Sequence, residues 1–272
     1  MLNKPADIAK LYIMVGYGKT VQKSWVLFLL GIFAGAFIAF GGLTSQIVSC
    51  GVAPAALGRF LSGVVFPVGL MMVIISGGEL FTGNCLIFIS VLSKETYFSA
   101  MLRNWAFVYL GNLVGGVAIA LLANFGQVLN LYDGELARLA VNTAKSKIAL
   151  PFHIALIKGI LCNFLVCISV WVSFSTEENV PGKIASLYLP ILLFVICGFE
   201  HCVANMYFIP AGILAKYLCG YAQDASFLSF LTGDLLPFFG KNLLPVTLGN
   251  IIGGFLVATG YWLIYLSQPD DD

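Results

Sequence analysis

The sequence predicts an all-α membrane protein with six transmembrane helices, arranged as two inverted three-helix repeats. Hydrophobic residues make up 60% of its 272 residues, charged residues only 10%, and the mean hydropathy is +0.95. Too few polar side chains are present to cover a soluble globule. Long apolar runs divide the chain, and its two halves carry the same motifs in the same order. These observations together predict the fold class.

The six spans are located by apolar runs, because a helix needs about 20 mostly apolar residues to cross the hydrocarbon core. The runs are too continuous for β-barrel strands, which alternate over about 10 residues. The first 24 residues are too polar for a signal peptide, so the first run is expected to be a retained helix. The predicted spans cover residues 25–47, 61–92, 105–125, 155–174, 184–217 and 244–266.

The second and fifth spans are too long for one straight crossing, and both hold polar residues near the middle. These residues lie between Ser76 and Asn84 in the second span and between Glu200 and Asn205 in the fifth. We expect both helices to be broken there. Non-helical backbone at mid-membrane depth is tolerated only where it is buried in protein or lines a watery path. The breaks therefore indicate transport.

The two halves of the chain repeat each other. The segment Leu110–Gly116 matches Leu248–Gly254, and the Glu and Asn of one break match those of the other at the same spacing of five residues. The repeats cover about 25–125 and 155–266. Because each contains three spans, the second repeat enters the membrane from the opposite side. Both termini then share one side, and the two breaks face each other.

Four lysines precede the first span, at positions 4, 10, 19 and 23. Positive charge near the first helix favours a cytoplasmic N-terminus. We therefore expect a multi-pass protein of the cell membrane (inner or plasma membrane) with both termini cytoplasmic. Residues 1–24 form a cytoplasmic N-terminal segment, 25–266 a single transmembrane channel domain, and 267–272 a cytoplasmic tail.

Six glycines recur at four-residue spacing within three of the spans, which places small residues on one helix face. Such a face packs helices closely, either within one bundle or between subunits, and the sequence leaves both open. The glycines are Gly31, Gly35, Gly111, Gly115, Gly249 and Gly253.

His201 and Thr82 are the polar residues in the breaks with the best case for function. An ionisable side chain inside the membrane is by default a functional candidate, and His201 lies in the middle of the fifth span. The alternative is a neutral histidine that hydrogen-bonds a carbonyl group and only stabilises the fold. Thr82 lies in the first break, and we expect its hydroxyl group to face a pore.

The other polar residues in the spans have more structural interpretations. Lys158 either extends to the lipid headgroups or attracts anions into a vestibule. The acidic and amide residues of the breaks are expected to stabilise the broken backbone. These loop-stabilising residues are Glu79, Asn84, Glu200 and Asn205.

Four segments closely resemble signatures of the formate/nitrite transporter family. They are residues 77–84, 163–167, 198–206 and 242–254. The resemblance extends over essentially the whole chain. It implies a homopentamer of aquaporin-like protomers in the lipid bilayer, each with its own pore. Such pores pass small monovalent anions or their conjugate acids: formate, nitrite, hydrosulfide and, in some members, lactate or acetate.

The resemblance also implies roles for individual residues. His201 matches the central pore histidine, and Thr82 matches the loop threonine opposite it. Lys158 and Asn163 match vestibule residues. The remaining matches are the two hydrophobic constrictions: Phe66 and Phe194 for the outer one, and Leu70, Leu80 and Phe81 for the inner one.

Elementary electrostatics gives a reason for this layout. An anion held between apolar side chains loses its hydration at a cost of many kcal/mol, and the neutral acid avoids most of that cost. A lysine that concentrates anions, followed by a dry constriction and a histidine that shares or relays a proton, would pass a weak acid and reject strong-acid anions.

Other function classes fit the sequence less well. An aquaporin-like pore for neutral small solutes is the alternative, but neither break contains Asn-Pro-Ala. A redox enzyme is disfavoured because the seven cysteines form no Cys-x-x-Cys pair. Neighbouring helix positions point about 100° apart, so residues 200–202 are a poor metal site. A net charge of +1 gives no basic surface for nucleic acid. We expect no enzyme activity, no cofactor and no metal.

Overall fold

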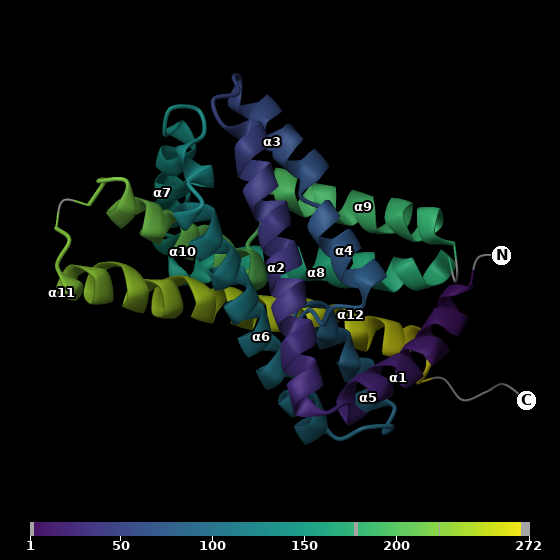
Figure 1. The fold of residues 1–272 in the computed structure, drawn as a ribbon. Coiled ribbons are helices and arrows are strands. Elements are labelled where there is room, and N and C mark those ends of the chain that lie inside the picture. Colours follow the sequence, from purple (N-terminus) through teal and green to yellow (C-terminus); the bar gives the residue numbers. More distant parts are fainter. Residues whose placement is uncertain (1–2, 177–178, 223, 268–272) are drawn as a thin grey trace, which may run out of the picture.

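The computed structural model describes residues 3–176, 179–222 and 224–267, so most of the expected C-terminal tail lies outside the described residues. Within these ranges the chain is a bundle of helices without β-strands (Figure 1). Six of the helices are long and apolar enough to cross a membrane. The predicted fold class, an all-helical protein with six spans, is confirmed.

The first half of the chain begins with a short helix and ends with a long one. Its second span is broken between α4 and the 3₁₀ helix η1. The elements are α1 (Pro5–Val21), α2 (Ser24–Ser49), α3 (Ala55–Val65), α4 (Val68–Ser76), η1 (Gly83–Ile87), α5 (Phe88–Leu92) and α6 (Phe98–Phe125).

The second half follows the same plan, with its break between α9 and α10. The elements are η2 (Val128–Asn130), α7 (Glu135–Ile148), α8 (Phe152–Ser173), η3 (Phe174–Thr176), α9 (Val180–Cys197), α10 (Cys202–Leu218), α11 (Phe227–Ser229), the π-helical η4 (Phe230–Leu235) and η5 (Phe238–Leu243), and α12 (Leu244–Tyr265).

The sixth span is longer than predicted. It runs from Phe227 to Tyr265, whereas the sequence indicated residues 244–266. Asp234 and Lys241 interrupt the apolar run that marks a span, and two π-helical turns carry the helix past them. Asp234 is accommodated because Lys216 donates to its carboxylate at 2.7 Å.

Glycine-mediated packing holds each repeat together. α2 packs along α6, and α8 packs along α12 (Figure 1). A Cβ atom added at Gly35 or Gly115 would meet backbone atoms of the facing helix, and the same is true at Gly249 and Gly253. The four-residue glycine faces therefore pack helices within one protomer, which resolves the alternative that the sequence left open.

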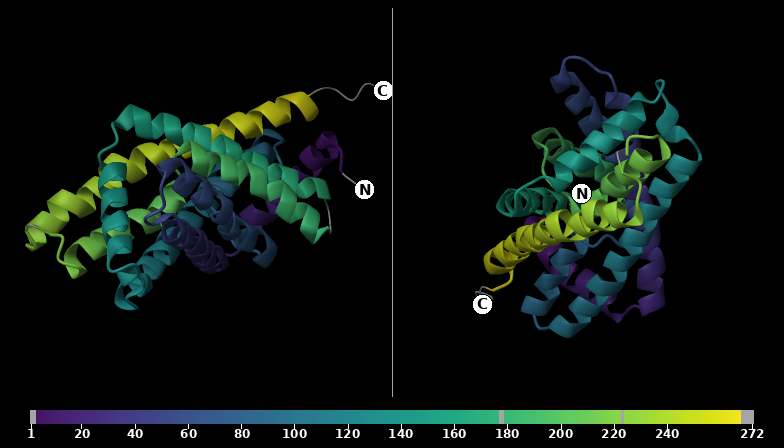
Figure 2. Two further views of the ribbon diagram at one scale, coloured as in Figure 1. Left: turned by 90° about the horizontal axis from the view of Figure 1, so that it is seen from above. Right: turned by 90° about the vertical axis from the view of Figure 1, so that its left-hand side faces the viewer.

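The pseudo-symmetry includes the short helices α1 and α7 as well as the spans. α1 covers one end of the bundle with Ile8 and Tyr12 buried, and α7 lies near the opposite end with Leu136 and Ala140 buried (Figure 1). The start of α1 and the end of α12 lie at the same end of the molecule (Figures 1 and 2). Inverted repeats with three spans each require this arrangement.

Candidate functional site

Each break begins with a glycine in the left-handed conformation. Gly77 caps the C-terminus of α4 with φ 84°, and Gly198 caps that of α9 with φ 67°. A residue with a side chain is strained at such angles, and glycine is the usual residue there. The loops that follow are not helical, so their buried backbone groups need partners from other parts of the chain. Some come from backbone carbonyls: the N–H of Glu79 donates to Leu30 at 3.2 Å, and that of Glu200 donates to Lys158 at 3.3 Å.

An asparagine supplies further partners in the first repeat. The side-chain amide of Asn112 donates to the carbonyl oxygens of Gly31 at 2.8 Å and Glu79 at 2.9 Å. Its Oδ1 accepts from the backbone N–H of Phe81 at 2.9 Å. One buried side chain thus joins α2, α6 and the loop.

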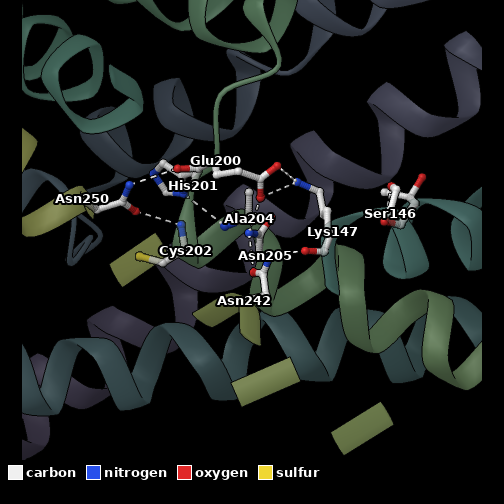
Figure 3. Close-up of polar contacts among 10 residues, drawn as sticks. Ser146, Lys147, Glu200, His201, Cys202, Ala204, Asn205, Asn242 and Asn250 are labelled. Carbon is white, nitrogen blue, oxygen red and sulfur yellow. Dashed lines mark hydrogen bonds and ion pairs between the residues drawn. The ribbon is translucent and has the colours of Figure 1, made fainter. Parts of the chain in front are cut away.

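Asn250 forms the same three bonds in the second repeat. Its amide donates to the carbonyl oxygen of Gly159 at 2.8 Å. The amide also donates to the carbonyl oxygen of Glu200 at 3.0 Å, and its Oδ1 accepts from the N–H of Cys202 at 2.9 Å (Figure 3). Both asparagines lie in the repeated Leu-Gly-Asn motif. The motif reveals the repeat in the sequence, but its role in holding the breaks becomes evident only in the structure.

The second break also carries a buried ion pair, shown in Figure 3. Lys147 donates to the Glu200 carboxylate at 2.9 and 3.0 Å, and Asn205 donates to the same carboxylate at 2.7 Å. Asn205 also donates to Asn242 Oδ1 at 2.7 Å, and Asn242 donates to the Lys147 carbonyl at 2.9 Å. We call these four residues the Glu200 network.

An equivalent Glu79 network supports the first break. Lys19 donates to Glu79 at 2.7 Å, and Asn84 donates to Glu79 at 2.6 Å and to Asn104 at 2.8 Å. Asn104 donates in turn to the Lys19 carbonyl at 3.0 Å. Lys19 and Asn104 lie 128 and 138 residues before their counterparts, the same offsets that relate Gly31 to Gly159 and Asn112 to Asn250. The sequence therefore contains a signal for Lys147 and Asn242: the same residue types recur at the offsets that relate the two repeats.

The symmetry fails at His201 and Thr82. The equivalent positions are Leu80 and Val203, which are apolar. His201 precedes α10, and its Nδ1 accepts from the N–H of Ala204 at 3.1 Å. Its Nε2 lies 3.0 Å from Thr82 Oγ1. Since Nδ1 accepts a hydrogen bond, the ring carries its proton on Nε2 and donates it toward Thr82.

Aromatic rings enclose this pair on one side. Phe66 and Phe194 meet edge to face with centroids 5.5 Å apart, and Phe194 stacks on His201 at 5.9 Å. Phe208 stacks on Phe66 at 6.5 Å. Both rings of the expected outer constriction are at most 4% exposed, so they form an apolar plug beside the histidine.

A cavity of about 530 Å³ leads to that plug. Its wall comes from α2, α3, α7, α8, α9 and α10, and includes Phe66, Phe194 and His201. Its charged lining residues are Arg59, Lys147, Lys158 and Glu200. Lys158 thus lines this cavity, and within the described part of the chain it has no carboxylate within 4.0 Å.

The other expected site residues lie deeper. Asn163 was expected in the vestibule, but it is fully buried and does not line the cavity. Its amide instead donates to the carbonyls of Thr82 at 3.2 Å and Asn250 at 2.7 Å, so it fixes the threonine loop from behind.

The residues expected at the inner constriction, Leu70, Leu80 and Phe81, are 2–4% exposed and also do not line this cavity. Phe81 packs edge to face against Trp105 and Tyr109, with centroids 5.5 and 4.9 Å apart.

Among the described residues, no group of three His, Cys, Asp or Glu side chains is placed to hold a metal ion. Cys202 points its backbone N–H at Asn250, and Glu200 is occupied by Lys147 and Asn205. The Glu200 carboxylate is therefore engaged within the protein, while Asn205 Oδ1 is buried without a partner among the described residues.

Six membrane spans, two breaks that meet at a histidine and a threonine, and a basic cavity above them define a multi-pass membrane transport protein. The family model described as Formate/nitrite transporter matches residues 6–263. The chain belongs to the formate/nitrite transporter family.

Curated relatives match over nearly the full chain. A "Probable formate transporter" of Methanothermobacter thermautotrophicus is 38% identical over 97% of both chains. "Formate channel FocA" of Haemophilus influenzae is 39% identical over 92% of this chain and 89% of its own. The Escherichia coli K12 protein of the same name is 34% identical over 98% and 95%.

Two solved structures share the fold. One, "Pentameric formate channel with formate bound", has a TM-score of 0.74 and 33% identity over 90% of this chain and 98% of its own. The other, "FNT family ion channel", has a TM-score of 0.82 and 26% identity over 97% and 99%. These relatives are channels and transporters, and the protein is a transport protein, not an enzyme.

Proposed function

We propose that the protein is a channel for small monovalent weak-acid anions, with formate as the first candidate and nitrite and hydrosulfide as further ones. The observation that carries the proposal is the Thr82–His201 pair beneath two phenylalanine rings, at the end of a cavity with three cationic side chains and one carboxylate. Formate is supported by the relatives, which are named as formate transporters or channels. A neutral-solute pore would gain nothing from the cations.

Lys158 acts first in this mechanism. It lines the cavity without a carboxylate partner among the described residues, so its charge raises the local anion concentration. Lys147 lines the same cavity but is held by Glu200. Its role is to support the broken backbone next to His201.

Phe66 and Phe194 form the selective step. An anion between their apolar rings would lose its hydration and gain no compensating charge there, because the charge of Lys147 in the cavity wall is already paired with Glu200. The neutral acid crosses at a much lower cost. The apolar plug thus couples protonation of the substrate to its passage and excludes strong-acid anions such as chloride.

His201 acts in this mechanism as a fixed hydrogen-bond donor. A second ring proton would sit on Nδ1, where the Ala204 N–H already points at 3.1 Å. The ring therefore stays singly protonated, with Nε2–H directed toward Thr82. The proton that crosses with the acid comes from the cavity solvent, and the Thr82–His201 pair offers the acid polar partners at the membrane centre. Leu70, Leu80 and Phe81 close the path beyond it.

We place the protein in the cell membrane with both termini cytoplasmic, as the lysines ahead of α2 favour. Assembly as a homopentamer is supported by the fold that this chain shares with a pentameric formate channel. Large apolar side chains on the bundle exterior, including Leu122, Phe125 and Leu256, suit lipid or a neighbouring subunit.

Stopped-flow uptake into proteoliposomes over a pH series tests the proposal. Formate, nitrite and hydrosulfide are compared with chloride and with glycerol as a neutral solute, and protein-free liposomes give the background. We expect weak-acid uptake that rises as pH falls, with little chloride or glycerol flux. Chloride uptake as fast as formate, or glycerol uptake faster than both, would contradict the proposal.

A further inference from the structure

Arg59 occupies a distinctive position in the cavity wall. It lies on α3, and its Nη1 is 3.5 Å from the carbonyl oxygen of Ile196 in the last turn of α9. Nη1 is also the atom nearest to a Cβ built on Gly198, so the guanidinium lies directly against the glycine that ends α9. The carbonyl end of a helix carries partial negative charge, which favours a cation there.

Most of the hydrogen-bonding capacity of Arg59 is unused. A guanidinium has five N–H donors in a planar fork, and the structure shows one long bond from them. The side chain is exposed, and the described residues place no carboxylate within 4.0 Å of it. An anion that enters the cavity therefore meets a cation with free donors.

The neighbouring hydroxyl groups do not compete for such an anion. Ser62 donates to the Ser45 carbonyl at 3.1 Å, and Thr143 donates to the Leu139 carbonyl at 2.8 Å. Both hydroxyl groups already donate their hydrogen atoms to helix carbonyl oxygens. What they present to the cavity is oxygen lone pairs, which repel an anion. Gln46 also lines the cavity with an unpartnered amide nitrogen, but that atom is buried. Among the charged residues of the described cavity wall, only Arg59 presents a planar pair of donors.

We propose that Arg59 is a specificity-determining residue that receives planar two-oxygen anions before they reach the Phe66–Phe194 plug. Two parallel N–H donors match the O–C–O of formate and the O–N–O of nitrite. Hydrosulfide offers a single acceptor atom and gains only from the charge. Lys158 is a point charge and attracts all three alike. This inference rests on the proposed function and deepens it.

The test compares substrates in the reconstituted full-length protein. Arg59→Lys keeps the charge and removes the fork. Initial uptake rates are measured against concentration for formate, nitrite and hydrosulfide. We expect the KM for formate and nitrite to rise roughly three- to tenfold, as for loss of one charge-assisted hydrogen bond at a solvent-exposed site, while kcat and hydrosulfide uptake stay unchanged. Arg138→Lys, on α7 outside the cavity wall, is the matched control and should match wild type.

A structural role for Arg59 predicts different results. If the guanidinium only caps α9, Arg59→Lys lowers kcat for all three substrates together with the unfolding temperature. Either that result, or an equal change in KM for hydrosulfide and formate, overturns the inference while the proposed function stands. A wild-type protein that passes none of these acids overturns both.

Discussion

Replacing Glu200 with Gln removes the negative charge from the Glu200 network and keeps the size of the side chain. Glu200 accepts three hydrogen bonds, two from Lys147 and one from Asn205. A Gln amide retains one acceptor oxygen and places an NH₂ group against donors. The variant therefore leaves either the lysine or the asparagine without its partner.

The loss in the free energy of unfolding can be estimated from the burial of the Lys147–Glu200 pair. The side chains of Lys147 and Glu200 are 16% and 6% exposed. Removal of one partner from a buried ion pair costs about 3–5 kcal/mol. Because Lys147 borders the cavity and can turn toward its water, we expect the lower end, about 3 kcal/mol. Lys147→Met should cost a similar amount, since it leaves the Glu200 carboxylate buried with Asn205 alone.

The assay is a double-mutant cycle on the purified protein, with the free energy of unfolding measured by denaturant titration in mixed micelles. The double variant Lys147→Met/Glu200→Gln should be more stable than the sum of the single losses predicts, by about 2 kcal/mol. Glu79→Gln is the matched comparison, because the Lys19–Glu79 pair is equally buried, at 21% and 7% exposure. It should lose about as much stability as Glu200→Gln.

Strictly additive losses would refute the reasoning, because they would show that Lys147 and Glu200 do not stabilise each other. A Glu200→Gln variant as stable as the wild type would refute it too.

Three further predictions concern transport. His201→Asn should change the uptake rate and keep its dependence on pH, because the ring is proposed to donate a hydrogen bond without titrating; a pH-independent rate in proteoliposomes would restore a relay role. Phe66→Ala or Phe194→Ala should raise uptake of the larger acid lactate several-fold relative to formate, and unchanged size selectivity in both would place the constriction elsewhere. Lys158→Glu should slow formate uptake most at low ionic strength, where screening is weakest, with Lys158→Ala in between. Equal, salt-independent rates in all three proteins would remove Lys158 from the path.

The fold could be predicted from the sequence because its strongest signals are local. Apolar runs and broken spans follow from the properties of the bilayer, and the repeated Leu-Gly-Asn motifs reveal the symmetry. The start of the sixth span was placed too late because charged residues such as Asp234 and Lys241 ordinarily indicate a loop. In the structure, two π-helical turns continue the helix through both residues, and Lys216 pairs with Asp234.

The supporting residues of the site were harder to find. Lys19 and Lys147 lie on the short helices α1 and α7, outside the apolar runs. A lysine in such a segment is ordinarily taken as solvent-exposed and as a marker of membrane orientation. Only the fold of α1 and α7 brings them to Glu79 and Glu200. The position of Asn163 behind Thr82 likewise depends on contacts between residues 81 positions apart.

The central claim is that the acid crosses in its neutral form, and lumenal pH during formate uptake tests it most directly. Proteoliposomes that contain a trapped pH indicator receive formate with and without an imposed membrane potential, and protein-free liposomes give the lipid background. The account predicts one proton delivered to the lumen per formate taken up, at a rate that the membrane potential does not change. Uptake that follows the membrane potential without acidifying the lumen would show that the bare anion passes, and would contradict the account.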